Sequence, residues 1–123
     1  PPVWRYLFTH TFENPAPQDA SLTLARAFHG AETFFITGNF QTLETSIAYS
    51  PSSAEIALSN EMMGYWARHA ATGDPNGSSA VPWLPYDAAS ENIQKLDDNI
   101  VTLAGGYRNA QCDFMTSLIT RGF

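Results

Sequence analysis

The residues best suited to chemistry lie in one short stretch, Ala27-Phe28-His29-Gly30-Ala31-Glu32. The imidazole of a histidine exchanges protons readily near neutral pH, so His29 is a candidate general base. Gly30 leaves backbone room beside the ring, which favours a histidine that is carried on a loop. Nucleophilic catalysis would also need a hydroxyl and a carboxylate that orients the imidazole, and neither is recognisable around His29.

A metal site at this stretch is a weaker alternative. His29 and Glu32 have the His-x-x-Glu spacing that suits one face of a helix, but Gly30 disfavours a helix there. His10 or His69 would have to complete the site, and the sequence offers no clear third ligand. We therefore predict no metal and no other cofactor. We expect His10 to be exposed at a strand end and His69 to interact with the last carbonyls of a helix.

One long strand is predicted among the elements that must position these residues. Val3 to Phe8 is rich in β-branched and aromatic residues and nearly continuous in apolarity, which is typical of a strand covered on both faces. Two prolines predict a loop over residues 13–21, in which Glu13 and Asp19 are solvated carboxylates. A single strand cannot form a sheet, so the sheet is expected to be incomplete.

Helices are predicted over much of the rest. An apolar cluster after His29 predicts a short helix that ends at Gly38-Asn39 and packs beneath the histidine. The cluster consists of Phe34, Phe35, Ile36 and Phe40. The clearest helix begins at a serine cap near Ser52, with Glu55 in its first turn, and ends at residue 71 or 72 before Gly73. Its large side chains are interpreted as packing residues: Met62, Met63, Tyr65 and Trp66. A short extended piece is predicted over residues 93–96, and a terminal helix is predicted over residues 107–118.

The composition narrows the classes of partner. Only 15% of the 123 residues are charged, whereas ordinary domains have about 25%. This deficit predicts that part of the surface faces other protein. The net charge of −6, with six Lys and Arg residues in all, argues against nucleic acid. No apolar run approaches the roughly 18 residues of a membrane span.

Several motifs in order resemble the C-terminal part of the type-B carboxylesterase/lipase family, the cholinesterase-like branch of the α/β-hydrolases. The resemblance covers almost the whole chain. It includes Val3-Trp4-Arg5-Tyr6-Leu7-Phe8, Phe28-His29-Gly30-Ala31-Glu32 and Phe35-Ile36-Thr37-Gly38-Asn39-Phe40. It continues through the stretch from Leu58 to Gly77 and ends at Gln111-Cys112-Asp113-Phe114.

The resemblance implies an α/β fold, with residues 1–123 as the C-terminal segment of a single α/β-hydrolase domain that has one main strand plus helices. It implies that His29 is the catalytic histidine of a serine esterase or lipase acting on a carboxylic ester. The family's Gly-x-Ser-x-Gly elbow, triad acid and oxyanion segment do not occur here and are expected upstream of Pro1. We therefore expect the isolated chain to be inactive, and to self-associate or bind the missing N-terminal portion.

The resemblance also bears on residues beside the candidate base. The family takes its triad acid from far upstream, so we interpret Glu32 as a helix N-terminal or supporting carboxylate and exclude it from the catalytic set. Cys112 matches a cysteine that some relatives bridge to an upstream cysteine, and a buried free thiol is the alternative. The family usually has proline after the tryptophan matched by Trp83, whereas this chain has Leu84 and then Pro85.

Two functional classes stay open on the sequence. The parent is either a serine ester hydrolase or a non-catalytic adhesion or binding relative that has lost triad residues. Retention of His29 in its motif favours the enzyme. The resemblance is compatible with a secreted or periplasmic protein, and the specificity for acyl and alcohol groups cannot be read from this segment.

Overall fold

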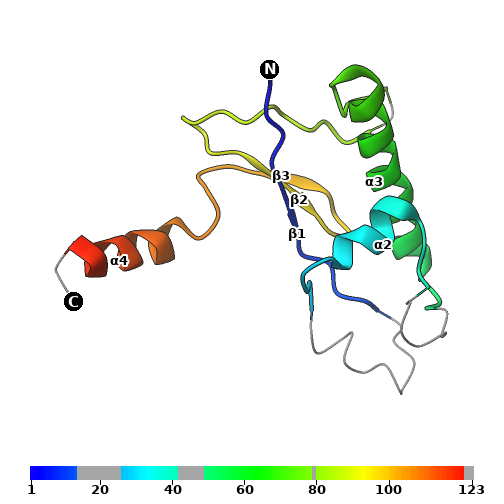
Figure 1. Ribbon diagram of the computed structural model, residues 1–123, viewed down its shortest axis with the longest axis horizontal. Helices are drawn as coiled ribbons and strands as arrows, with labels where there is room; N and C mark the ends of the chain where they lie inside the picture. The colour runs from blue at the N-terminus through cyan, green and yellow to red at the C-terminus, as the bar shows by residue number, and fades with distance from the viewer. Residues whose placement is uncertain (14–25, 42–48, 79, 121–123) are drawn as a thin grey trace.

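The computed structural model describes residues 1–13, 26–41, 49–78 and 80–120. Figure 1 shows a small sheet with two helices on one side and a third helix that extends away from the rest. The strands are β1 (Tyr6–Phe8), β2 (Ile93–Leu96) and β3 (Val101–Leu103), and the helices are α2 (Ala31–Thr37), α3 (Ser53–Thr72) and α4 (Asn109–Thr120). An α/β architecture was predicted and is confirmed.

The sheet has the strand order β1-β2-β3. β1 runs parallel to β2, with Tyr6 opposite Gln94, and β2 runs antiparallel to β3, with Ile93 opposite Leu103. The short extended piece predicted over residues 93–96 is confirmed as β2. β3 was not predicted, because it has only three residues and gives almost no periodic signal. In the described part of the chain β1 pairs on one side only, which leaves it at the edge of the sheet.

The first strand is shorter and less covered than predicted. Regular pairing is confined to Tyr6–Phe8. The carbonyl of Arg5 also accepts from the N–H of Gln94 in β2 at 2.9 Å, and the residues before β1 bond in addition to an irregular segment. The carbonyl of Val3 accepts from the N–H of Tyr86 at 2.7 Å, and the carbonyl of Arg5 accepts from the indole of Trp83 at 3.1 Å. Val3 and Tyr6 are exposed, so this strand is not covered on both faces here.

Helix α3 begins and ends where its caps require. The hydroxyl of Ser52 accepts from the N–H of Glu55 at 3.1 Å, and the carboxylate of Glu55 accepts from the N–H of Ser52 at 2.8 Å, which completes a capping box. Gly73 has a left-handed backbone (φ 79°) and donates to the carbonyl of His69 at 2.8 Å. Both predicted boundaries of this helix are confirmed.

Helices α2 and α3 pack together over the sheet. The hydroxyl of Ser59 donates to the carbonyl of Phe35 at 2.8 Å, which joins the two helices where both are buried. Gly38 ends α2 in a left-handed conformation (φ 64°) close to Met63. The core beneath the helices is largely aromatic and includes Phe12, Phe35, Tyr49, Leu58, Met62, Tyr65, Trp83 and Leu96. The predicted short helix and the packing role of Met62 and Tyr65 are confirmed.

Helix α4 buries none of its side chains. Phe114, Met115 and Ile119 are among the most exposed large apolar residues of the described chain. Cys112 is a free, exposed cysteine on the same helix, so the second of the two alternatives, a buried thiol, does not describe it. None of the described helices is long and apolar enough to cross a membrane.

Replacing Ser52 with Ala should destabilise the chain by about 1 kcal/mol, because the N–H of Glu55 loses its side-chain acceptor. Urea unfolding followed by circular dichroism measures this difference. Ser53→Ala, one residue further on at an exposed position, is the matched control and should leave the unfolding midpoint unchanged. Equal midpoints for Ser52→Ala and Ser53→Ala would contradict the cap.

Candidate functional site

His29 lies exposed on the turn that leads into α2. The turn is closed by a hydrogen bond from the N–H of Ala31 to the carbonyl of Phe28 at 3.0 Å. Gly30 follows His29 in a left-handed conformation (φ 86°) that a residue with a side chain rarely adopts. The loop placement that the sequence predicted for His29 thus corresponds to a tight turn with a glycine that the backbone geometry requires.

The neighbours of His29 are anchored although its own ring is exposed. Phe28 stacks on the buried ring of Phe12, with centroids 6.0 Å apart and an angle of 22° between the planes. Ala31 has no exposed surface. Glu32 lies in the first turn of α2, as predicted. The partial burial of Tyr6 raises the pKa of its hydroxyl, and the nearby negative charge of Glu32 adds to that rise.

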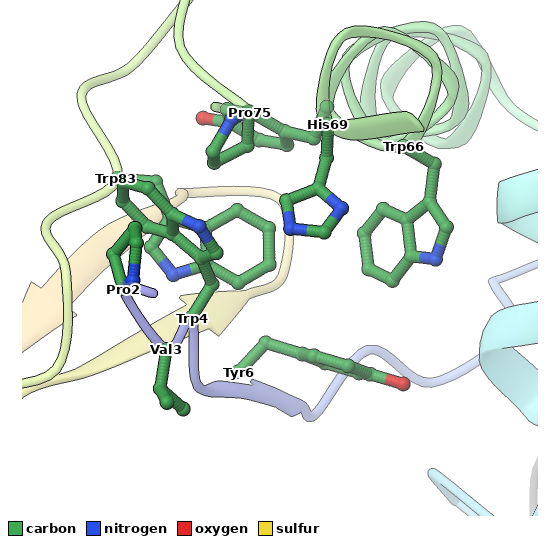
Figure 2. A pocket seen from close by; sticks show the side chains of 9 residues that line it. Pro2, Val3, Trp4, Tyr6, Trp66, His69, Pro75 and Trp83 are labelled. Carbon is green, nitrogen blue, oxygen red and sulfur yellow. The ribbon is translucent and has the colours of Figure 1, made fainter. Parts of the chain in front are cut away.

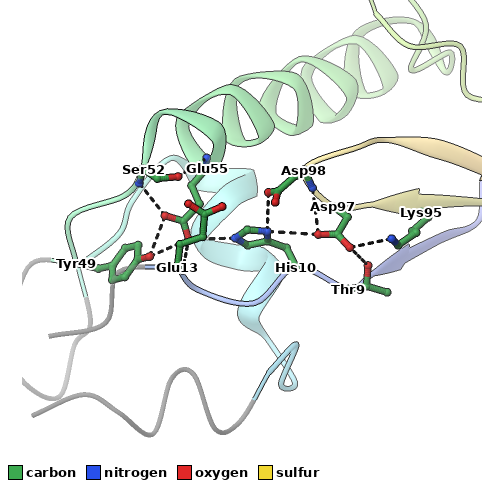
Figure 3. A network of polar contacts seen from close by, with 9 residues as sticks. All are labelled: Thr9, His10, Glu13, Tyr49, Ser52, Glu55, Lys95, Asp97 and Asp98. Carbon is green, nitrogen blue, oxygen red and sulfur yellow. Dashed lines mark hydrogen bonds and ion pairs between the residues drawn. The ribbon is translucent and has the colours of Figure 1, made fainter. Parts of the chain in front are cut away.

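A buried polar cluster lies at the end of β1, and Figure 3 shows it centred on His10. His10 is 2% exposed, so the expectation of an exposed histidine was wrong. Its Nε2 lies 3.0 Å from Oε1 of Glu55, and its Nδ1 lies 3.0 Å from Oδ1 of Asp98 and 3.5 Å from Oδ1 of Asp97. Each ring nitrogen of His10 therefore faces a carboxylate.

The carboxylate of Glu55 is fully buried and collects donors from several segments. In addition to His10, it accepts from the hydroxyl of Tyr49 at 2.8 Å and from the N–H of Glu13 at 3.1 Å. Burial by itself raises the pKa of Glu55, but the hydrogen bonds from Ser52, His10, Tyr49 and Glu13 outweigh it, and the pKa lies below its ordinary value.

Asp97 and Asp98 contribute the other side of this cluster from the turn between β2 and β3. Asp97 accepts from the hydroxyl of Thr9 at 2.7 Å and pairs with Nζ of Lys95 at 2.9 Å. Burial by itself raises the pKa of Asp97. The contacts with Lys95 and Thr9 lower it by more, so the pKa lies below its ordinary value. By spacing, His10, Asp97 and Asp98 could each offer an atom to one cation. Lys95 supplies a positive charge beside Asp97.

An aromatic pocket of about 370 Å³ lies at the other end of β1 from His10, between the start of the chain and the second half of α3. Figure 2 shows His69 pointing into it beside Trp66, with Tyr6 beneath. Several rings around it touch each other edge to face, as do Tyr6 and Trp66 with centroids 5.2 Å apart. His69 lies in the last turn of α3, as expected, and its side chain lines this aromatic pocket.

The structure does not gather the sequence candidates into one site. His10 and Glu55 lie together, His69 lies in the aromatic pocket, and His29 lies on its own turn among the described residues. Asp19 and most of the predicted loop over residues 13–21 fall outside the described residues. Glu13 is exposed, as expected, although its backbone is bonded to Glu55. Sequence reasoning used Glu55 only as a helix cap and missed its partners.

Residues 1–115 match the model of the carboxylesterase family. The chain belongs to the carboxylesterase family. Carboxylesterase 5A of Mus musculus is 36% identical over 105 residues, which cover 82% of this chain and 17% of that protein. Acetylcholinesterase of Gallus gallus is 33% identical over 94 residues, which cover 76% of this chain and 12% of that protein.

Solved structures of the family have the same architecture. A thermophilic PNB esterase superposes with a TM-score of 0.69 and 27% identity, over 90% of this chain and 21% of that one. In these three matches this carboxylesterase-family chain spans between 12% and 21% of its relatives' length. The resemblance inferred from the motifs is thereby confirmed for the family and the fold.

The lowered pKa of Glu55 makes this carboxylate one of the groups on which stability in acid depends. A carboxylate with a depressed pKa in the folded state stabilises the fold above its unfolded pKa, and this contribution is lost as the pH falls through the folded value. Glu55→Gln should therefore be less stable at neutral pH and should lose less stability on acidification from about pH 6 to about pH 3. Urea midpoints measured across this range test it.

Ser52→Ala is the control for this measurement, because it weakens the cap of the same helix and leaves the carboxylate in place. It should lower the urea midpoint at every pH and retain the acid dependence of the unmodified chain. If Glu55→Gln showed the same loss on acidification as the unmodified chain, Glu55 would not be the group responsible.

Proposed function

We propose that this chain is the C-terminal segment of a carboxylic-ester hydrolase domain and that His29 is its general base and then general acid. The observation that carries the proposal is the presentation of His29. An exposed imidazole follows an anchored aromatic residue and precedes a glycine that closes the turn, within a segment that matches the carboxylesterase family. Such a ring can reach groups supplied from outside the segment.

The reaction assigns two proton transfers to His29. In the first, a serine hydroxyl attacks the ester carbonyl carbon while the imidazole takes the hydroxyl proton, and the alcohol leaves with that proton from the ring. In the second, water attacks the acyl-enzyme by the same route and releases the acid. The serine, the carboxylate that orients the ring and the oxyanion donors come, in this proposal, from a part of the domain beyond this segment.

Two features support the role of an incomplete domain segment. β1 pairs on one side only in the described residues, and parallel pairs such as β1 and β2 normally belong to larger, covered sheets. Helix α4 exposes an apolar stripe that a complete domain would bury, formed by Phe114, Met115 and Ile119. The intact motif around His29 favours the hydrolase over a non-catalytic relative.

The purified chain alone should not hydrolyse a p-nitrophenyl ester, because the proposal places the nucleophile outside it. Turnover should appear when the chain is co-expressed with a truncated PNB esterase from which the matching 21% of the chain has been removed. His29→Asn should abolish that turnover, since the amide cannot carry the proton. Release of p-nitrophenol, followed by absorbance, measures both.

His69→Asn is the matched control for that complex and should leave turnover unchanged, because His69 faces the aromatic pocket. Full turnover with His29→Asn would refute the assignment of the base. Turnover by the chain alone, abolished by His29→Ala and by a serine-directed phosphonate, would refute the claim that the nucleophile lies elsewhere.

The chain alone should also self-associate through α4. Replacing both Phe114 and Ile119 with Ser removes two of the most exposed apolar side chains and should shift the sedimentation coefficient toward that of the monomer. Leu84→Ser, at an exposed apolar site outside α4, is the control and should sediment like the unmodified chain. A monodisperse monomer before any substitution would contradict this expectation.

A further inference from the structure

The buried carboxylate of Glu55 is connected to the turn that carries His29. We propose that Glu55 is a positioning residue for His29, acting through the stretch from His10 to Glu13 and through the ring of Phe12. The proposal rests on the proposed function of His29 for its catalytic meaning. The physical connection between Glu55 and His29 stands on contacts within the described chain.

Each oxygen of Glu55 has a partner of its own, and the two oxygens share the hydroxyl of Tyr49. Oε2 accepts from the N–H of Ser52 at 2.8 Å and so closes the start of α3. Oε1 accepts from the N–H of Glu13 at 3.1 Å and lies 3.0 Å from Nε2 of His10. The hydroxyl of Tyr49 lies 2.8 Å from both oxygens. A carboxylate that only capped the helix would need none of the contacts at Oε1.

The contacts at Oε1 fix both ends of a four-residue stretch. His10 and Glu13 are held to the same oxygen atom, so the backbone between them curves around the carboxylate, as Figure 3 shows. Phe12 lies inside this stretch and is 2% exposed. Its ring lies 5.0 Å from the ring of Tyr49 and 5.7 Å from that of Phe35, centroid to centroid. The position of Phe12 is therefore determined by the polar anchor and by the core together.

Phe12 in turn supports the residue next to the candidate base. Its ring stacks on Phe28 at 6.0 Å and meets Phe34 of α2 edge to face at 5.6 Å. Phe28 precedes His29 directly, and its carbonyl closes the turn by accepting from the N–H of Ala31. A displacement of Phe12 therefore shifts Phe28 and, with it, the turn that carries the imidazole of His29.

The test uses the imidazole signals of the full 123-residue chain in ¹H–¹³C correlation spectra. The chain has three histidines, so each signal can be assigned by single substitution. Glu55→Gln removes the negative charge that holds His10 and Glu13 and should shift the signals of both His10 and His29. The signal of His69, in the aromatic pocket, should stay in place and serves as an internal reference against general unfolding.

Two further variants separate positioning from stability. Ser52→Ala removes the hydroxyl that accepts from the N–H of Glu55 and leaves the partners of both carboxylate oxygens in place. It should therefore lower the unfolding midpoint and leave the signal of His29 unchanged. Phe12→Leu retains the contacts of Glu55 and shortens the platform under Phe28, so it should shift the signal of His29. If Glu55→Gln failed to fold, Phe12→Leu and Ser52→Ala would still decide between the two roles.

The inference is overturned if neither Glu55→Gln nor Phe12→Leu moves the signal of His29, or if Ser52→Ala moves it equally. This outcome is distinct from failure of the proposed function. Loss of turnover with His29→Asn in the complemented enzyme, together with an unmoved His29 signal, would refute the positioning role alone. Full turnover with His29→Asn and a shifted signal would leave the physical connection in place and remove its catalytic meaning.

Discussion

A carboxylate without access to solvent must find enough hydrogen-bond donors inside the protein, since the free energy of an unpaired buried charge exceeds the stability of a small domain. In this chain that carboxylate is Glu55, and its donors come from the end of β1, from Tyr49 and from the start of α3. The requirement therefore joins segments that are far apart in the sequence. His10 extends the same constraint to Asp97 and Asp98 beyond β2.

The elements that could be predicted from the sequence are those whose signals are local. The limits of α3 follow from Ser52, Glu55 and Gly73, which act within one turn of the helix ends, and α2 follows from its apolar cluster and Gly38. β3 was missed because three residues carry no period. β1 was predicted from its apolar run, but its short length depends on partners in β2 that no local pattern specifies.

The candidate site, too, could be predicted only where its signals are local in the sequence. His29 was recognised from the motif around it, and its turn geometry follows from Gly30, which is its neighbour. The burial of His10 was not predictable, because it depends on Glu55 and on the aspartates after β2, and a polar residue at a strand end is usually exposed. Glu55 was read correctly as a cap, but the second oxygen of its side chain has partners that only the folded chain brings close.

The parallel pairing of β1 with β2 has a consequence for the order of folding. Thr9 and Asp97, which bond just beyond this pair, are 88 positions apart in the sequence, so the pairing closes a loop that includes both α2 and α3. Closing such a loop has a large entropic cost before any stabilising contact forms. Bringing α2 and α3 together costs less, because they are near neighbours in the chain. The two helices are thus expected to associate early, and the sheet to form late, on the surface that they have already assembled.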